Sequence, residues 1–298
     1  MVITHEQEPF IQAIGRDWFQ DRVAEVAMLR LDVVHHNVSG NKWYKLKYNI
    51  EYCERNNIKS ILTFGGAYSN HLAATAAMAN LCGLSSIGIV KGTYAEKELT
   101  PTLIFCREQG MRLVFVTHED YARKYDKAWL EYLSAQYDHP MIIPEGGANE
   151  QGRTGAAEIA SMVPRHYTHI AVSVGTGTTL AGIADRVEGG VRLIGFAPMK
   201  GGRYLNDEVG KLVSRNNFTI YDDWHFGGFG KHTGELVSFM NKFYIEQQVP
   251  LDMVYTAKMM FGLQQQILTG MYDKQAKILC LHTGGLQGNV SLKDKLVY

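Results

Sequence analysis

The sequence predicts an α/β fold with two lobes, each a mostly parallel β-sheet flanked by helices. Two observations lead to this prediction. The chain has 298 residues, more than one ordinary hydrophobic core organises, so two α/β lobes or one large barrel are the candidate architectures. From about Lys59 onward, short apolar runs alternate with longer amphipathic ones, a pattern typical of βα units that feed a parallel sheet.

Two series of predicted βα units follow one another along the chain. The first has strands at Ser60–Phe64, Ser86–Val90, Arg112–Val116 and Met141–Pro144, and helices at Ser69–Leu81, Pro101–Gln109, Glu119–Gln136 and near Glu158. The second has strands at Thr168–Val174, Val191–Met199 and Lys277–Gly285, and a helix at Leu180–Val187. The less regular stretch 216–234, rich in aromatic residues and glycine, is either a poorly ordered surface segment or an active-site wall.

Composition and charge exclude several classes of partner. Acidic and basic residues balance at 30 each, so no net field gathers nucleic acid or anionic lipid. The N-terminal residues lack an apolar leader, and no run approaches the roughly 20 apolar residues of a membrane span. The four cysteines are widely separated, which favours free thiols over a zinc site or disulfides. We expect a cytoplasmic protein without nucleic-acid, membrane or metal partners.

Four short segments place small and polar residues at predicted strand ends or helix starts, where ligands bind in open α/β sheets. They are Ser39–Lys42, Gly65–His71, Gly175–Thr179 and Thr283–Gly285. In Gly175–Thr179 the glycines free backbone N–H groups and the threonines add hydroxyls, which suits a phosphate. The segment lacks the third glycine of a dinucleotide fingerprint and the lysine of a P-loop, and a plain tight turn is the alternative interpretation.

Lys42 stands at a predicted helix start, where the helix dipole disfavours a cation and favours a neutral amine. A neutral amine is the nucleophile that condenses with an aldehyde. The alternative is an ordinary surface lysine, and Lys45 and Lys47 lie close by in the sequence. Ser69 and Asn70 open the next helix, either as an N-cap or as groups that bind a ring substituent.

In order, these segments resemble the family of 1-aminocyclopropane-1-carboxylate deaminases and D-cysteine desulfhydrases, which are fold type II, tryptophan-synthase-β-like pyridoxal-phosphate enzymes. The resemblance runs from about Leu29 to Gly288. It implies pyridoxal 5'-phosphate as the cofactor, a small amino acid as the substrate and a homodimer. It also implies a larger cofactor-binding lobe, 1–44 with 156–298, and a smaller mobile lobe, 45–155, that closes over the substrate.

The resemblance assigns roles to individual residues. The family's lysine segment, G-G-N-K-x-R-K-L-E, is similar to SGNKWYKLK here, so Lys42 would carry the cofactor as a Schiff base. The family's G-G-x-x-S-N-[HQ] is similar to the segment ending in Ser69, Asn70 and His71. Asn70 would bind the pyridine 3-oxygen, and Ser69 would contact the substrate carboxylate or move a proton beside it, with His71 next to them.

Three later segments complete the resemblance. The family's phosphate loop, T-G-[ST]-T, is similar to TGTT here, so the phosphate would be bound by Gly175, Thr176, Gly177, Thr178 and Thr179. The family's D-P-V-Y-[TE]-x-K is similar to DMVYTAK, which makes Tyr255 a catalytic wall residue and Thr256 the partner of the pyridine nitrogen. The turn His282–Gly285 resembles the last turn beneath the ring.

Departures from the family pattern bear on the reaction. Ring-opening deaminases have glutamate where Thr256 stands, and a hydroxyl sustains a protonated pyridine nitrogen less well. His71 matches the desulfhydrase form of its motif. Both observations favour β-elimination, which would convert D-cysteine to pyruvate and ammonia. Lys42 would be the base that removes the α-proton. Phe229 stands where the family has an active-site tyrosine in the substrate pocket, which puts the substrate preference in doubt.

Several alternatives to D-cysteine elimination stay open. The enzymatic ones are ring opening of 1-aminocyclopropane-1-carboxylate and elimination of sulfite from cysteate. The others are a non-catalytic pyridoxal-phosphate binding protein and a protein that binds a nucleotide or sugar phosphate at Gly175–Thr179. The last one gives no role to Lys42.

Overall fold

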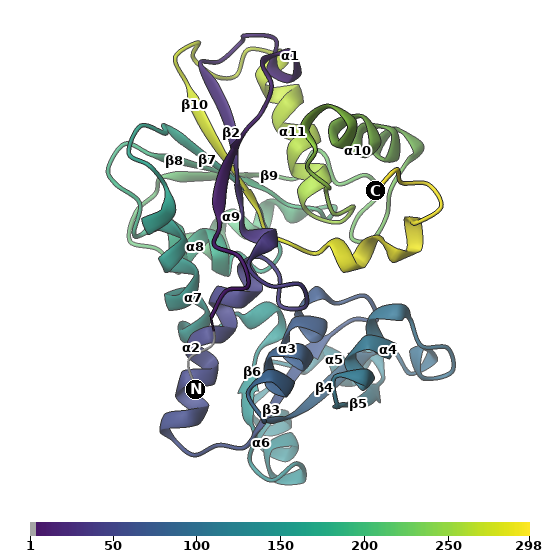
Figure 1. Ribbon diagram of the computed structural model, residues 1–298. Helices are drawn as coiled ribbons and strands as arrows, with labels where there is room; N and C mark the ends of the chain where they lie inside the picture. The colour runs from purple at the N-terminus through teal and green to yellow at the C-terminus, as the bar shows by residue number, and fades with distance from the viewer. Residues whose placement is uncertain (1–3) are drawn as a thin grey trace. The chain divides into compact units, whose positions relative to one another are not determined.

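The computed structural model describes residues 4–298, and this part of the chain divides into two compact units. Unit 1 comprises Thr4 and Lys42–Gly155, and unit 2 comprises His5–Asn41 and Ala156–Tyr298. Each unit has one β-sheet with helices on both of its faces (Figure 1). The α/β class with two mostly parallel sheets is therefore confirmed, while the mobility of the smaller lobe stays a prediction.

The sheet of unit 1 is wholly parallel, with strand order β5-β4-β3-β6. Its strands are β3 (Ser60–Gly65), β4 (Ser85–Lys91), β5 (Met111–Val116) and β6 (Met141–Ile143). Its helices are α2 (Asn41–Arg55, whose first residue belongs to unit 2), α3 (Asn70–Leu81), α4 (Pro101–Glu108), α5 (His118–Ala122) and α6 (Lys127–Gln136). All four predicted strands of this unit are present, within one residue at either end.

Two hydrophobic clusters hold the helices of unit 1 to its sheet. In one, Leu72 of α3 and Leu103 of α4 pack with Val90 of β4. In the other, Leu133 of α6 packs with Phe64 of β3, together with Tyr121 of α5. Because both faces are covered, these parallel strands are continuous apolar runs rather than alternating ones.

The single helix predicted for Glu119–Gln136 is wrong, because the structure has two helices there. Thr117 caps the first, since its hydroxyl accepts from the Asp120 N–H at 3.0 Å. Asp126 caps the second, since its carboxylate accepts from the Trp129 N–H at 2.8 Å. A side chain that binds the free N–H groups of a new first turn starts a new helix.

The sheet of unit 2 has the strand order β1-β2-β10-β7-β8-β9. Its strands are β1 (Phe10–Ala13), β2 (Glu25–Arg30), β7 (His169–Ser173), β8 (Arg192–Phe196), β9 (Phe218–Tyr221) and β10 (Lys277–His282). Only the β1–β2 pair is antiparallel. Strand β9 lies inside the stretch that the sequence marked as irregular, so that interpretation is wrong for residues 218–221.

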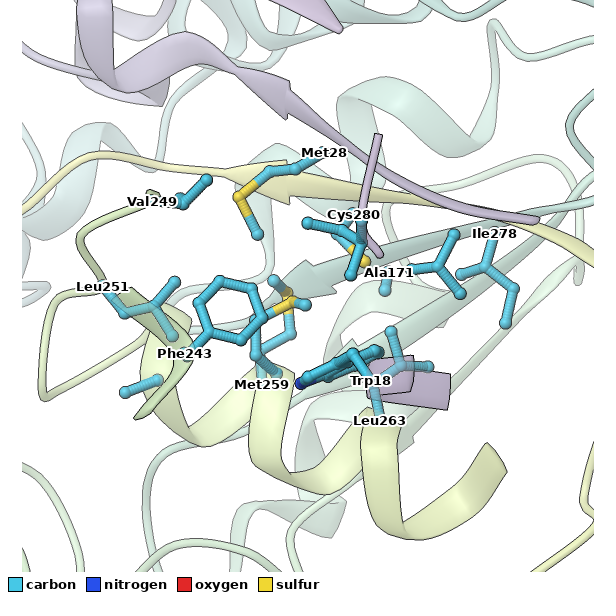
Figure 2. Close-up of a cluster of buried hydrophobic side chains, with 14 of the residues drawn as sticks. Trp18, Met28, Ala171, Phe243, Val249, Leu251, Met259, Leu263, Ile278 and Cys280 are labelled. Atoms are coloured by element: carbon cyan, nitrogen blue, oxygen red, sulfur yellow. The ribbon is translucent and has the colours of Figure 1, made fainter. Parts of the chain in front are cut away.

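One face of this sheet carries an apolar cluster formed with α1 (Arg16–Phe19), α10 (Gly234–Gln247) and α11 (Thr256–Leu268). Figure 2 shows Phe243, Met259 and Leu263 from the helices beside Met28 and Cys280 from the strands. The helices α8 (Thr178–Ala184) and α9 (Leu205–Gly210) also contact the sheet. The last α-helix in chain order before β7 is α7 (Glu150–Ala157), and a 3-10 helix, Glu158–Met162, follows it.

Within each unit, the parallel strands end at one edge of the sheet. In unit 2 the segments that follow β2, β7, β8 and β10 therefore start from the same edge, and these include Gly175–Thr179 and Thr283–Gly285. In unit 1 the segments after β3 and β6 do the same, and they include Gly65–His71. The folds thus gather the polar segments within each unit.

The structure also bears on the expectations for the cysteines and for membrane-spanning helices. The four cysteines are free thiols, three of them buried and Cys82 half-buried. No helix within residues 4–298 combines the length and the apolar character needed to cross a lipid bilayer.

Candidate active site

The segment Gly175–Thr179 forms the turn between β7 and α8. Gly177 has a φ of +78°, and a Cβ on it would lie 2.4 Å from Cγ2 of Val209. The hydroxyls of Thr176 and Thr178 are 2.9 Å apart. Glycine is therefore required at Gly177 by both conformation and space, and the turn offers hydroxyls and backbone N–H groups to a small anion.

Asn41 is bonded to this turn. Its side-chain amide donates to Oγ1 of Thr179 at 2.7 Å, and both residues are buried. The preceding residue, Gly40, has a φ of +67°, and a Cβ on it would lie 2.0 Å from the carbonyl oxygen of Thr283. The backbone just before Lys42 is therefore fixed to two of the polar segments of unit 2, the turn after β7 and the turn after β10.

A buried ion pair between Arg30, at the end of β2, and Asp32 lies next to the backbone that leads to Lys42. The guanidinium of Arg30 donates two hydrogen bonds to Asp32, Nε to Oδ1 at 2.8 Å and Nη2 to Oδ2 at 2.7 Å. Burial acts to raise the pKa of Asp32, but His282 and Arg30 outweigh it and lower the pKa. The Asp32 carbonyl also accepts from the Ser39 hydroxyl at 3.0 Å. A bidentate pair between a guanidinium and a carboxylate fixes the relative orientation of the two side chains. This pair and the Ser39 hydrogen bond therefore hold the backbone of residues 30–39 in one conformation.

Thr256 is bonded to Asp252 rather than exposed to a ligand. The Thr256 hydroxyl donates to Oδ1 of Asp252 at 2.8 Å and accepts from the Asp252 N–H at 2.8 Å. The other carboxylate oxygen accepts from the N–H groups of Val254 and Tyr255, each at 3.0 Å. The Thr256 side chain is 0 % exposed, whereas Thr283 at the end of β10 is 9 % exposed.

Tyr255 connects the glycine turn, Gly175–Thr179, with the aromatic loop, residues 222–231. A Cβ on Gly175 would lie 3.4 Å from Cε1 of Tyr255, so the tyrosine ring lies over the first glycine of the turn. The Tyr255 ring also meets Phe229 edge to face, with centroids 6.0 Å apart. Phe229 is 48 % exposed. The loop around Phe229 is therefore joined to the glycine turn through one ring contact.

In unit 1, Ser69 is an N-cap. Its hydroxyl accepts from the Leu72 N–H at 3.2 Å, at the start of α3. A Cβ on Gly65 would lie 2.6 Å from Oγ of Ser69, so glycine is needed where β3 passes this hydroxyl. The capping interpretation of Ser69 is confirmed, and this leaves its hydroxyl hydrogen available to a ligand.

Lys45 is a buried amine beside Lys42. It is 2 % exposed, and its Nζ donates to the carbonyl of Gly146 in the turn after β6. Burial, and secondly the charge of Lys42, hold the pKa of Lys45 well below its ordinary value. Lys42 itself is half-buried. Two amines therefore share a poorly solvated part of unit 1, which favours the neutral form of Lys45.

His71 lies in the same part of unit 1. Burial, followed by the charges of Lys42 and Lys45, holds its pKa well below the ordinary value, so the ring is neutral near pH 7. Oγ1 of Thr63 is 2.8 Å from Nε2 of His71 and donates to the Ile143 carbonyl at 2.7 Å. Because Thr63 has one hydrogen, it accepts from His71, which places the ring proton on Nε2.

A family model described as "Pyridoxal-phosphate dependent enzyme" matches residues 20–284 of this chain. The chain belongs to this family. Pyridoxal phosphate is therefore its cofactor. In unit 2 the donors of the glycine and threonine turn suit a phosphate, and in unit 1 a poorly solvated lysine amine suits an aldehyde. The resemblance found in the sequence is confirmed.

This pyridoxal-phosphate enzyme is similar in sequence or structure to three known proteins. A Pyrococcus horikoshii protein with a provisional 1-aminocyclopropane-1-carboxylate deaminase name is 28% identical, over 92% of this chain and 88% of its own. The mitochondrial bifunctional D-cysteine desulfhydrase/1-aminocyclopropane-1-carboxylate deaminase of Arabidopsis thaliana is 28% identical, over 91% and 75%. The solved structure of an ACC deaminase homologue aligns over 99% of this chain and 95% of its own, with a TM-score of 0.83 and 27% identity.

Sequence reasoning missed three residues of this pyridoxal-phosphate enzyme that support the candidate site. They are Asn41, Asp252 and Lys258, and each acts on the backbone or on a neighbouring side chain. Asp252 lies four residues before α11, and its carboxylate accepts from the N–H of Thr256, the first residue of that helix, at 2.7 Å. The motifs SGNKWYKLK and DMVYTAK contain Asn41 and Lys258, but they do not reveal the contacts of these residues, because the partners are 138 and 30 to 60 residues away.

Proposed function

We propose that this enzyme eliminates the β-substituent of D-cysteine or a similar small amino acid, giving pyruvate and ammonia. One observation carries the proposal. Asn41, the residue before Lys42, is hydrogen bonded to Thr179 in the glycine and threonine turn. This bond joins the backbone that leads into the only lysine expected to carry the cofactor to the turn expected to hold the cofactor phosphate. The D-cysteine desulfhydrase name of the Arabidopsis relative supports the substrate.

The residues divide the work as follows. Bound pyridoxal phosphate supplies a sink for the electrons of the broken Cα–H bond. Lys42 takes the α-proton as general base, and beside it lies Lys45, whose pKa burial holds well below its ordinary value. The Cβ–S bond breaks with its electrons on sulfur, which leaves as hydrosulfide. One water then replaces nitrogen, which leaves as ammonia.

Binding roles follow from the resemblance and from the geometry. We assign the cofactor phosphate to Gly175–Thr179, the pyridine 3-oxygen to Asn70, and the substrate carboxylate to Ser69 with His71 beside it. Tyr255 and Phe229 form a wall next to the substrate. For the pyridine nitrogen Thr256 is the sequence-based candidate, and Thr283 is a second one, favoured because Thr256 is fully buried and bonded to Asp252.

Lys42→Ala tests the proposal. The wild-type protein with added pyridoxal phosphate is expected to show a visible absorption band and to release pyruvate and sulfide from D-cysteine in equal amounts. Lys42→Ala should lose both the band and the products. Lys47→Ala, which changes a half-buried lysine whose Nζ lies 5.2 Å from the Tyr48 ring, should keep both. Elimination that survives in Lys42→Ala would contradict the assignment.

A second candidate function is ring opening of 1-aminocyclopropane-1-carboxylate, favoured by the names of the relatives from both organisms. It would release 2-oxobutanoate and ammonia, and sulfite release from cysteate is a further variant of elimination. Comparing products from the three substrates separates these activities. A stable visible band without turnover of any of them would indicate a non-catalytic pyridoxal-phosphate protein.

We also propose that the enzyme is a cytoplasmic homodimer. Family resemblance supports this proposal. Light scattering of the purified protein, at micromolar concentrations and with the cofactor bound, measures the mass directly. A mass of one chain, 33.4 kDa, would contradict the dimer.

A further inference from the structure

Lys258 is a lysine inside the core of unit 2, on the first turn of α11. It is 2 % exposed, and its neighbours along the helix, Met259 and Met260, are both fully buried. Burial lowers the pKa of Lys258 to about 8, although Asp252 acts to raise it. An isolated buried amine is costly, so the contacts that the Lys258 amine makes must offset part of that cost.

Those contacts are three backbone carbonyls. Nζ donates to the carbonyls of Gly228 at 2.7 Å and His225 at 2.9 Å, and lies 3.4 Å from that of Pro198. An ammonium has three N–H donors, so one donor is available to each carbonyl. Pro198 follows β8, whereas the other two belong to the aromatic loop 222–231. The amine therefore ties this loop to the end of a strand and to a helix.

The loop has little regular structure of its own. Four of its residues have positive φ, namely Phe226 at 49°, Gly227 at 92°, Gly228 at 117° and Gly230 at 63°. Within the loop, the Gly228 N–H donates to the His225 carbonyl at 2.9 Å, the same carbonyl that accepts from Lys258. Glycines leave such a backbone many alternative conformations, so its position depends on external anchors. Lys258 is one anchor, and the Phe226–Phe261 ring contact at 5.0 Å is another.

The loop carries Phe229, one residue after an anchored carbonyl. Phe229 meets the ring of Tyr255, which lies over Gly175 of the glycine turn. A continuous set of contacts within unit 2 thus runs from the Lys258 amine to the candidate binding residues. Resting on the proposed function, we infer that Lys258 is a positioning residue, which fixes loop 222–231 and thereby the Phe229–Tyr255 wall that selects the substrate.

Amide hydrogen exchange of Lys258→Met tests the first half of this inference without any activity. Methionine keeps the length of the side chain and removes the donors. We expect faster exchange in the peptide that contains residues 224–231, with α10 and β10 unchanged. Lys231→Met is the matched control, since it removes an exposed lysine from the same loop and should leave exchange unchanged. A folded Lys258→Met protein with wild-type exchange would overturn the inference.

Kinetics and ligand affinity test the second half. For Lys258→Met we expect KM for the substrate to rise about tenfold with kcat within about twofold, since a wall that is loosened weakens binding more than chemistry. D-alanine has no leaving group, and its affinity, read from the cofactor band, should fall by the same factor. In a Phe229→Ala background the Lys258→Met effect should disappear. Faster exchange with unchanged KM and unchanged D-alanine affinity would overturn the role in substrate selection.

Gly228→Ala gives a second route, in case Lys258→Met does not fold. A Cβ at Gly228 meets nothing within 4 Å, so the substitution strains only the loop backbone at φ +117°. It should reproduce the loop exchange and the KM change. If the wild-type enzyme processes none of the proposed substrates, the proposed function fails, and exchange together with D-alanine affinity still decides the role of Lys258.

Discussion

The side-chain amide of Asn41 lies 2.7 Å from Oγ1 of Thr179 and donates a hydrogen bond to it, although the two residues are 138 positions apart in the chain. Asn41 is the first residue of α2, and Thr179 belongs to the first turn of α8. The bond therefore sets the start of one helix against the start of another. Within unit 2 it links the backbone just before Lys42 to the turn that we expect to bind the phosphate.

Asn41→Ala is expected to weaken cofactor binding by about tenfold, because it removes one buried hydrogen bond and leaves the Thr179 hydroxyl without that donor. Titration of the apoprotein with pyridoxal phosphate, followed by visible absorbance, measures the change. Asn56→Ala is the control, since the side-chain amide of this exposed asparagine donates to the Tyr52 carbonyl nearby in the sequence. An affinity equal to the wild-type value in Asn41→Ala would show that the bond does not organise the turn.

His71→Gln should flatten the dependence of stability on acid pH. The pKa of His71 is depressed in the folded protein, so below about 6.5 the unfolded chain binds more protons than the folded one. The contribution of His71 to the free energy of unfolding is therefore fully present above about pH 6.5. It declines as the pH falls, by up to about 1.4 kcal/mol per pH unit. Urea unfolding between pH 5 and 7.5 measures both proteins. Other histidines contribute equally to both, and parallel curves would refute the neutral, buried ring.

Gly40→Ala should destabilise unit 2 by about 3 kcal/mol, because its Cβ would lie 2.0 Å from the Thr283 carbonyl oxygen at a φ of +67°. Gly201→Ala isolates the conformational part of the cost. Gly201 has a φ of +72° in the same unit, with nothing within 4 Å of a Cβ, so about 1 kcal/mol is expected. Denaturant unfolding compares the two. Equal losses would mean that the close approach of the backbones is unimportant.

Phe229→Tyr should raise kcat/KM for 1-aminocyclopropane-1-carboxylate relative to D-cysteine by about tenfold, because it adds a hydroxyl to the wall at the position where the family has tyrosine. Phe229 is 48 % exposed, so stability should change by less than about 0.5 kcal/mol. Phe226→Tyr, in the same loop but packed on Phe261, should leave the ratio unchanged. A ratio that does not move in Phe229→Tyr would remove this residue from the specificity determinants.

Thr283→Val and Thr256→Val should affect the cofactor band differently. If Thr283 meets the pyridine nitrogen, its valine variant shifts the band and its pH dependence while stability changes little. Thr256→Val instead breaks the bonds with buried Asp252, and should cost about 2 kcal/mol of stability. Absorption spectra and thermal unfolding of both variants decide which threonine binds the pyridine nitrogen. A band shift confined to Thr256→Val would restore the sequence-based assignment.

The sequence predicted the strands of unit 1 well, because runs such as Ser60–Phe64 are buried on both faces and remain apolar throughout. It failed where a single polar side chain decides the structure, as with Asp126, whose cap divides one expected helix into two. Strand β9 was missed because FTIY is short and lies between polar residues. For the site, motif spacing indicated Lys42 and Gly175–Thr179, but not the burial of Lys258, since lysine is exposed in most contexts.

The strand order of unit 2 has a consequence for how the protein is made. Strand β10 pairs with both β2 and β7, as in Ile278 beside Val26 and His169. Until residues 277–282 leave the ribosome, β2 and β7 each lack this neighbour, whereas unit 1 apart from Thr4 is one unbroken run that can fold earlier. A chain interrupted before β10 would hold two partial sheets with open edges, which are prone to aggregate. Proteolytic quality control should therefore act more strongly on incomplete chains of this protein than on those of a fold whose strands pair in sequence order.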